Sequence, residues 1–310
     1  MNDLMKVSSN PHIRSKISTD KIMLCVILAL LPTTCFGVVN FGMRALWIVL
    51  IAVGTSVLTE ILFDIIAHKD ISVKDMSAVV TGLLLGLNLP VNVPFYIPVI
   101  GGIFAIFVVK MLFGGLGKNF MNPALAARCF LVISFPAAMT DFTCDAYTGA
   151  TPLALLKKGE EVNAFDMITG RINGTIGETS MIAIIIGACF LLLLGVIDLR
   201  IPGSYLVTFI IFVGLFGPKG FNPYYMCAQL AGGGLMLGAW FMATDYVTRP
   251  VTRAGQYVYG IILGLLTGIF RVFGNSAEGV SFAIILGNLL VPLIERYTFP
   301  KPFGRGGEHR

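Results

Sequence analysis

The feature that most constrains the fold is a series of long apolar blocks that occupy most of the chain. A helix needs about 20 apolar residues to cross the hydrocarbon core of a bilayer, and many of these blocks approach that length. The expected membrane segments are residues 22–39, 43–66, 76–89, 95–113, 122–137, 179–197, 202–217, 226–243, 256–273 and 280–298. The sequence therefore predicts an all-α integral membrane protein with about ten transmembrane or broken helices.

The composition excludes most other classes of protein. Hydrophobic residues make up 56% of the 310 residues and charged residues only 13%, whereas soluble domains carry roughly 25% charged residues. The net charge of +5 comes from basic residues between the apolar blocks, with no basic stripe interleaved with aromatic residues, so nucleic acid is not an expected partner. The six cysteines form no C-x-x-C pair, so no local metal signature is present.

The basic residues also predict the orientation in the membrane. With the N-terminus in the cytoplasm, most lysines and arginines of the connecting segments fall on the cytoplasmic side, as the positive-inside rule requires. Both termini are then cytoplasmic, and one long polar loop faces outward. The predicted parts are an N-terminal tail 1–21, a first membrane half 22–137, the outer loop 138–178, a second membrane half 179–298 and a C-terminal tail 299–310.

Two membrane segments contain helix breaks. Pro90 and Pro94 follow residues 76–89, and Pro123 and Pro136 bracket the fifth segment. Backbone groups freed at membrane depth must bind protein or a wet cavity, and broken helices often mark the working centre of a transporter.

A weak internal repeat accompanies these breaks. Residues 82–86 match residues 234–238, and residues 110–114 resemble residues 271–274. The two copies would run in opposite directions, which predicts two inverted repeats. The alternative is chance similarity between glycine-rich apolar helices.

Several charged residues lie within or beside membrane segments. Glu60 and Asp64 share one helical face, and carboxylates inside a membrane suggest a path for Na⁺ or H⁺. Asp245 is a third candidate for this path. The alternative is a solvated helix end, because Glu60 and Asp64 lie near the predicted cytoplasmic surface. Lys110 is expected to extend its ammonium group to the inner surface.

The densest polar chemistry lies in the outer loop. The run from Thr148 to Pro152 reads Thr-Gly-Ala-Thr-Pro, which predicts a turn. From composition alone this is an ordinary loop rich in hydroxyl groups.

The same loop resembles the flavinylation motif of the RnfD/NqrB family, Asp-Gly-x-(Ser/Thr)-Gly-Ala-(Ser/Thr). Residues 10–14, 80–90 and 112–125 are similar to other signatures of this family, and the compact length resembles RnfD more than NqrB. The resemblance implies FMN bound to Thr151 through a phosphoester, in a site completed by Asp145, Thr148, Gly149 and Ala150. Ala146 departs from the motif, which has glycine there.

The resemblance also implies a function. RnfD-type proteins are subunits, inactive alone, of complexes that couple electron transfer between ferredoxin and NAD to outward movement of Na⁺ or H⁺ across the bacterial cytoplasmic membrane. The expected partners are RnfA, RnfB, RnfC, RnfE, RnfG, a flavin transferase and membrane lipid. Whether the protein also binds a second flavin, such as riboflavin, stays an open question at this point.

Three residues on or just before the fifth segment, Asn119, Asn122 and Arg128, are candidates to hold the phosphate or ring of FMN. For Arg128 the alternative is an ion pair between helices. Two other functions stay open for the whole chain. One is an NqrB-like component that reduces quinone, and the other is a transporter or channel for a small solute.

Overall fold

The structure is a computed structural model that describes residues 18–68, 72–142, 151–157, 162–170, 172–274 and 279–300. All regular structure in these ranges is helical, which confirms the predicted all-α fold. Four helices are long and apolar enough to cross a membrane, namely α1 (Thr19–Phe41), α2 (Met43–Ile66), α13 (Arg253–Val272) and α14 (Val280–Thr298).

The remaining elements are shorter. The apolar ones of intermediate length are α3 (Ser77–Leu87), α4 (Tyr96–Ile103) with its continuation η2 (Phe104–Met111), α5 (Pro123–Ser134), α9 (Met181–Leu193) and α10 (Arg200–Phe216). The others are η1 (Ser72–Asp75), α6 (Pro136–Met139), α7 (Pro152–Lys157), α8 (Ala164–Thr169), α11 (Pro223–Ala231), α12 (Leu235–Leu237) and η3 (Gly238–Met242). Both η2 and η3 are π-helical turns, which are often found at functional sites.

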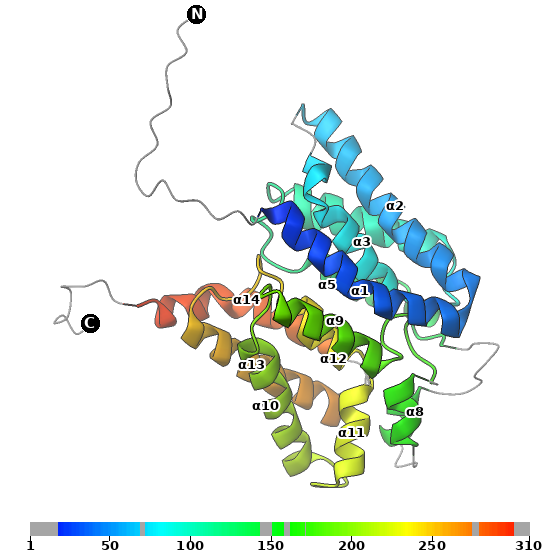
Figure 1. Ribbon diagram of the computed structural model, residues 1–310, viewed down its shortest axis with the longest axis vertical. Helices are drawn as coiled ribbons and strands as arrows, with labels where there is room; N and C mark the ends of the chain where they lie inside the picture. Colours follow the sequence, from blue (N-terminus) through cyan, green and yellow to red (C-terminus); the bar gives the residue numbers. More distant parts are fainter. Residues whose placement is uncertain are drawn as a thin grey trace, which may run out of the picture.

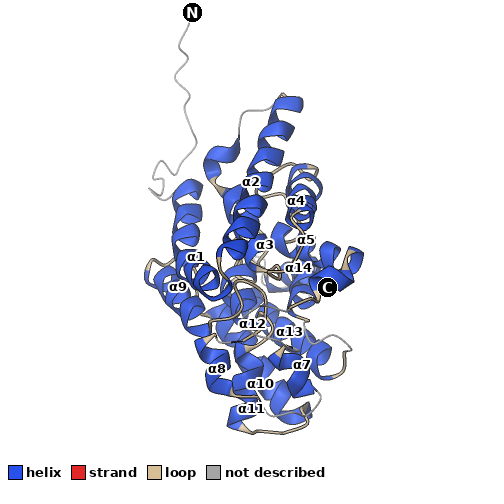
Figure 2. Ribbon diagram, turned by 90° about the vertical axis from the view of Figure 1, so that its right-hand side faces the viewer, coloured by secondary structure: helices blue, strands red, loops and turns tan. Residues whose placement is uncertain are grey.

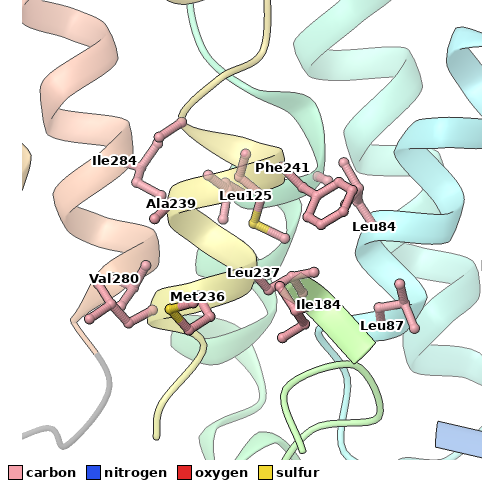
Figure 3. Close-up of a cluster of buried hydrophobic side chains, with 14 of the residues drawn as sticks. Leu84, Leu87, Leu125, Ile184, Met236, Leu237, Ala239, Phe241, Val280 and Ile284 are labelled. Atoms are coloured by element: carbon pink, nitrogen blue, oxygen red, sulfur yellow. The ribbon is translucent and has the colours of Figure 1, made fainter. Parts of the chain in front are cut away.

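The helices form two groups that contact each other along two seams. In the first group α2 packs against α3 and α4, and in the second α10 packs against α13 (Figure 1). Across the groups α1 packs against α9, and α5 packs against α14. The apolar core lies between them, where Leu84, Leu125, Phe241 and Ile284 approach one another from α3, α5, η3 and α14 (Figure 3).

The breaks predicted from proline are present. Helix α3 ends at Leu87, and Nδ2 of Asn88 donates to the carbonyl oxygen of Leu84 at 2.6 Å. Helix α5 begins at Pro123, where Asn122 caps it by accepting from the backbone nitrogens of Ala124 at 3.0 Å and Leu125 at 3.4 Å. Proline at the first helical position after an asparagine cap is a favoured helix start.

The predicted segment 226–243 is wrong as a single helix. Helix α11 ends at Ala231 and α12 begins at Leu235. Between them Gly233 and Gly234 have φ values of +65° and +67°, a conformation that glycine adopts without steric cost. The three consecutive glycines therefore end one helix and redirect the chain into the next.

The two copies of the proposed repeat share two structural details. Helices α3 and α12 each follow a left-handed residue, Met76 at φ +58° and Gly234 at φ +67°. Lys110, at the end of η2, donates to Oγ of Ser77 at the start of α3. In the same way Arg271, near the end of α13, donates to the carbonyl oxygen of Gly233, just before α12.

The predicted loop 138–178 is only partly a surface loop. It contains the end of α6, all of α7 and all of α8, and α8 packs against α11 (Figure 2). Its last residues lie against the end of α3, where the backbone nitrogens of Ile176 and Gly177 donate to the carbonyl oxygens of Leu89 and Leu87 at 3.1 and 2.8 Å. Glu178 is buried in this part of the loop. The boundary at residue 178 therefore divides a segment that belongs to the body of the protein.

Candidate functional site

Thr151 lies directly before α7 and beside a small cavity of about 20 Å³. Its side chain is half-buried. The residues that line this Thr151 cavity include Asn173, Glu178 and the backbone of Gly232 and Gly233. The other four motif residues, Asp145, Thr148, Gly149 and Ala150, lie outside the described residues.

Arg128 is linked to the Thr151 cavity through a buried ion pair. Its Nη1 lies 3.1 Å from Oε1 of Glu178, and both side chains are about 5% exposed or less. The same nitrogen donates to Oδ1 of Asn88 and to Oγ of Ser281, each at 3.0 Å. The structure therefore shows Arg128 in an ion pair, which was the alternative to flavin contact. Its partner, Glu178, lines the Thr151 cavity.

Asn119 and Asn122 lie in a different place from Thr151. They line a second cavity of about 210 Å³, here called the asparagine cavity, whose walls also include Met23, Leu84 and Phe241. Nδ2 of Asn122 donates to the carbonyl oxygen of Met242 at 3.4 Å. The buried Oδ1 of Asn119 has no hydrogen-bond partner among the described residues. The sequence grouped both asparagines with the flavin on Thr151, and Thr151 is not among the residues that line this cavity.

Glu60 and Asp64 belong to a buried charged cluster that includes Lys110. The alternative of a solvated helix end for the two carboxylates is therefore wrong, and so is the expectation that Lys110 extends to the surface. Nζ of Lys110 lies 2.8 Å from Oε2 and 2.9 Å from Oε1 of Glu60, and the Lys110 side chain is 2% exposed. Oγ of Ser72 lies 2.6 Å from Oε1 of Glu60 and 2.8 Å from Oδ2 of Asp64. Lys110 stays inside because Glu60 supplies a buried countercharge.

Lys110 connects this cluster to the asparagine cavity, which Asp245 also lines. The lining of the cavity includes Asp245 and Arg249, and also Lys110, which binds Glu60. The Asp245 carboxylate accepts from the backbone nitrogen of Val247 at 3.4 Å and from Oγ1 of Thr248 at 3.2 Å. Burial raises the pKa of the Asp245 carboxyl above its ordinary value. Of the three carboxylates of the predicted ion path, Asp245 therefore lines the cavity directly, and Glu60 borders it through Lys110.

Sequence reasoning missed Glu178 and Ser281. Glu178 was counted as a loop residue, and Ser281 lies in an apolar block without any motif. One signal was available, because an arginine inside an apolar segment requires a buried partner. A search for that partner among acidic residues at the segment ends would have included Glu178.

Comparisons with known proteins agree with this architecture. The profile of the NQR2, RnfD, RnfE family matches residues 6–304. The D subunit of the Na(+)-translocating ferredoxin:NAD(+) oxidoreductase complex of Acetobacterium woodii is 48% identical, over 98% of this chain and 97% of the relative. The D subunit of the proton-translocating ferredoxin:NAD(+) oxidoreductase complex of Clostridium ljungdahlii is 39% identical, over 97% of each chain. Since these matches extend over nearly the whole sequence, the protein belongs to the NQR2, RnfD, RnfE family.

Proposed function

We propose that this protein is the D subunit of an ion-translocating ferredoxin:NAD oxidoreductase complex in a bacterial cytoplasmic membrane. The observation that carries the proposal is the similarity, over almost the entire length, to the D subunits of two such complexes. One relative is named as sodium-translocating and the other as proton-translocating, so the coupling ion is Na⁺ or H⁺. The chain acts together with RnfA, RnfB, RnfC, RnfE and RnfG and catalyses no turnover alone.

The cofactor of this protein is FMN on Thr151, attached by a flavin transferase. The flavinylation motif supports this, and so does the half-buried position of Thr151 directly before α7. The adjacent cavity of about 20 Å³ is far smaller than the 300–1,000 Å³ typical of ligand pockets, so the ring must lie outside it. FMN supplies one- and two-electron chemistry, while the residues around Thr151 fix its attachment point.

Denaturing gel electrophoresis tests this attachment. The chain is produced with its flavin transferase, and a fluorescent band after denaturation reports a covalent flavin. Thr151→Ala should abolish the band, whereas Thr151→Ser should keep it because serine also supplies a hydroxyl group. Thr148→Ala is the comparison variant and should weaken the band less, since it removes a hydroxyl group of the motif without removing the acceptor. A band that persists in Thr151→Ala would place the flavin elsewhere.

The asparagine cavity, which would have to widen from about 210 Å³ to hold a whole flavin, is the proposed place for a second, non-covalent flavin such as riboflavin. Its walls are mostly apolar, as an isoalloxazine ring requires, and include Leu84 and Phe241. The amide groups of Asn119 and Asn122 offer donors and acceptors to a polar ring edge, and Oδ1 of Asn119 is free to accept.

Flavin extraction tests this second site. Acid releases non-covalent flavin from the purified chain, and chromatography identifies it. Leu84→Trp fills the cavity and should reduce the released flavin severalfold, while Leu193→Trp, on an 88% exposed position of α9, should leave it unchanged. Equal release from both variants would exclude this cavity, whatever the result at Thr151.

The ion path is proposed to include Glu60, Asp64 and Asp245. The burial of the first two carboxylates supports this assignment, and so does the position of Asp245 on the cavity that Lys110 also lines. In the reconstituted complex, Asp245→Asn should lower ion transport more than it lowers electron transfer. A parallel loss of both activities would indicate a structural role instead.

A further inference from the structure

A cavity of about 280 Å³, which the proposed function does not use, lies where α10 and α13 end. Its walls come from α7, α11 and the last residues of α10 and α13. Most of the lining is apolar and includes Phe216, Val272 and Phe273. Two basic side chains, Lys157 and Arg271, also line it, and the described residues of the lining include no aspartate or glutamate. This space is here called the basic cavity.

The basic cavity lies at the end of a membrane-spanning helix. Helix α13 is long and apolar enough to cross a bilayer, and Arg271, Val272 and Phe273 belong to its last turn and its C-cap. The ends of such a helix lie close to the lipid headgroups, because the apolar part of the helix matches the hydrocarbon core. Phe216 and Phe273 are 56% and 66% exposed, and their ring centroids are 6.3 Å apart. The cavity therefore has an apolar rim that acyl chains can contact.

The two basic side chains reach the cavity from different helices. Nη2 of Arg271, in α13, donates to the carbonyl oxygens of Gly232 at 2.7 Å and Gly233 at 3.0 Å. Nζ of Lys157, in α7, donates to the carbonyl oxygen of Gly274. These carbonyl groups are neutral, so the contacts cancel neither positive charge. An ammonium group has three N–H donors, so Lys157 can also donate to a ligand.

We propose that the basic cavity binds the phosphate of an anionic phospholipid. Lys157 donates to the phosphate oxygens, and Arg271 adds a second positive charge from another wall. Basic pockets between membrane helices bind anionic headgroups in this way. The cavity holds only the headgroup, because the acyl chains stay in the bilayer along Phe216 and Phe273. A free phosphate ion offers the same charge but leaves this apolar rim without a partner.

The lipid would lie next to the proposed flavin attachment. Leu153 lines both the basic cavity and the Thr151 cavity. Arg271 also holds the carbonyl groups of Gly232 and Gly233, two residues that line the Thr151 cavity. A flavin attached to Thr151 is therefore the nearest competing occupant of the basic cavity.

Native mass spectrometry tests lipid binding with the purified full-length chain, produced with its flavin transferase. Phosphatidylglycerol and phosphatidylcholine with identical acyl chains are added separately, and the lipid-bound fraction is measured. Phosphatidylglycerol should bind more tightly. Lys157→Gln should weaken its binding roughly fivefold and leave phosphatidylcholine unaffected, because one basic contact is lost. Lys157→Arg keeps the charge and should keep most of the affinity.

Two further variants separate the cavity from surface charge in general. Val272→Trp fills the basic cavity without changing any charge, and it should also weaken phosphatidylglycerol binding severalfold. Lys118→Gln is the matched control, because Lys118 is an exposed lysine outside the cavity. This control should bind phosphatidylglycerol as the wild type does.

Four results would overturn the lipid site. They are equal binding of the two lipids, an unchanged affinity in folded Lys157→Gln, complete displacement of phosphatidylglycerol by millimolar inorganic phosphate, and lipid binding by Thr151→Ala but not by the flavin-bearing chain. The third would assign the cavity to free phosphate and the fourth to the flavin. A wild-type chain that binds the lipid but shows no fluorescent band would count against FMN on Thr151 and leave the lipid site supported.

Discussion

Loss of the lysine in the buried pair Lys110–Glu60 should destabilise the protein strongly. In Lys110→Met the Glu60 carboxylate loses two hydrogen bonds, at 2.8 and 2.9 Å, and keeps its charge in a fully buried position. Asp64 lies on the same helical face and shares Ser72 with Glu60, so a second carboxylate adds repulsion. Removing one partner of such a pair costs roughly 3–5 kcal/mol.

This cost is measurable as a shift in thermal stability. At about 2–4 °C per kcal/mol, Lys110→Met should lower the midpoint of unfolding by on the order of 10 °C. The purified protein is heated in detergent, and the remaining folded fraction is followed by size-exclusion chromatography. The double variant Lys110→Met/Glu60→Gln removes both charges and should recover most of the loss, because no unpaired charge remains.

The ion pair Arg200–Asp198 is the matched control. Its nitrogen and oxygen are 3.1 Å apart, but the Asp198 side chain is 54% exposed. Exposed pairs contribute little, so Asp198→Asn should shift the midpoint by only about 1–2 °C. A shift in Lys110→Met no larger than in Asp198→Asn would refute the reasoning from burial. A double variant as unstable as Lys110→Met would show that packing, and not charge, explains the loss.

Three other predictions follow, two from the structure and one from the distribution of basic residues in the sequence. Gly234→Ala should reduce folded yield, because alanine at φ +67° is strained and its Cβ would overlap Glu178; a normal yield and melting temperature would contradict this. Asn122→Ala should cost about 1 kcal/mol through the lost cap of α5, and Asn122→Asp should retain most of the stability in the same melting assay. A membrane-impermeant thiol reagent should label Glu160→Cys but not Arg305→Cys in intact cells lacking other reactive cysteines, and the reverse pattern would invert the predicted topology.

Helix breaks were predictable from the sequence where a single residue type caused them. Pro90, Pro94, Pro123 and Pro136 exclude a continuous helix locally, and α3 and α5 have the expected short lengths. The break at Gly232 was missed because glycine, unlike proline, permits a helix and only weakens it. The next two residues, Gly233 and Gly234, have positive φ values. Arg271 donates to the carbonyl oxygen of Gly232, 39 residues earlier in the chain, and no local sequence pattern reveals this contact.

The electrostatic arrangement was the least predictable part. Lys110 was expected at the surface, since a lysine near a helix end usually extends into water. It is buried because Glu60 lies opposite it, 50 residues earlier in the chain. Similarly, Arg128 binds Glu178, which lies far along the sequence in a loop whose end folds back onto α3. Such pairings depend on tertiary packing, whereas the attachment motif around Thr151 is local.

The proposed flavin attachment is tested most directly by the mass of the peptide that contains Thr151, isolated from the native membrane complex. Proteolysis followed by tandem mass spectrometry locates a modification on an individual residue. We expect an FMN increment on Thr151, with the neighbouring Thr148 unmodified. An unmodified Thr151 in a complex that transfers electrons from ferredoxin to NAD would contradict the proposal.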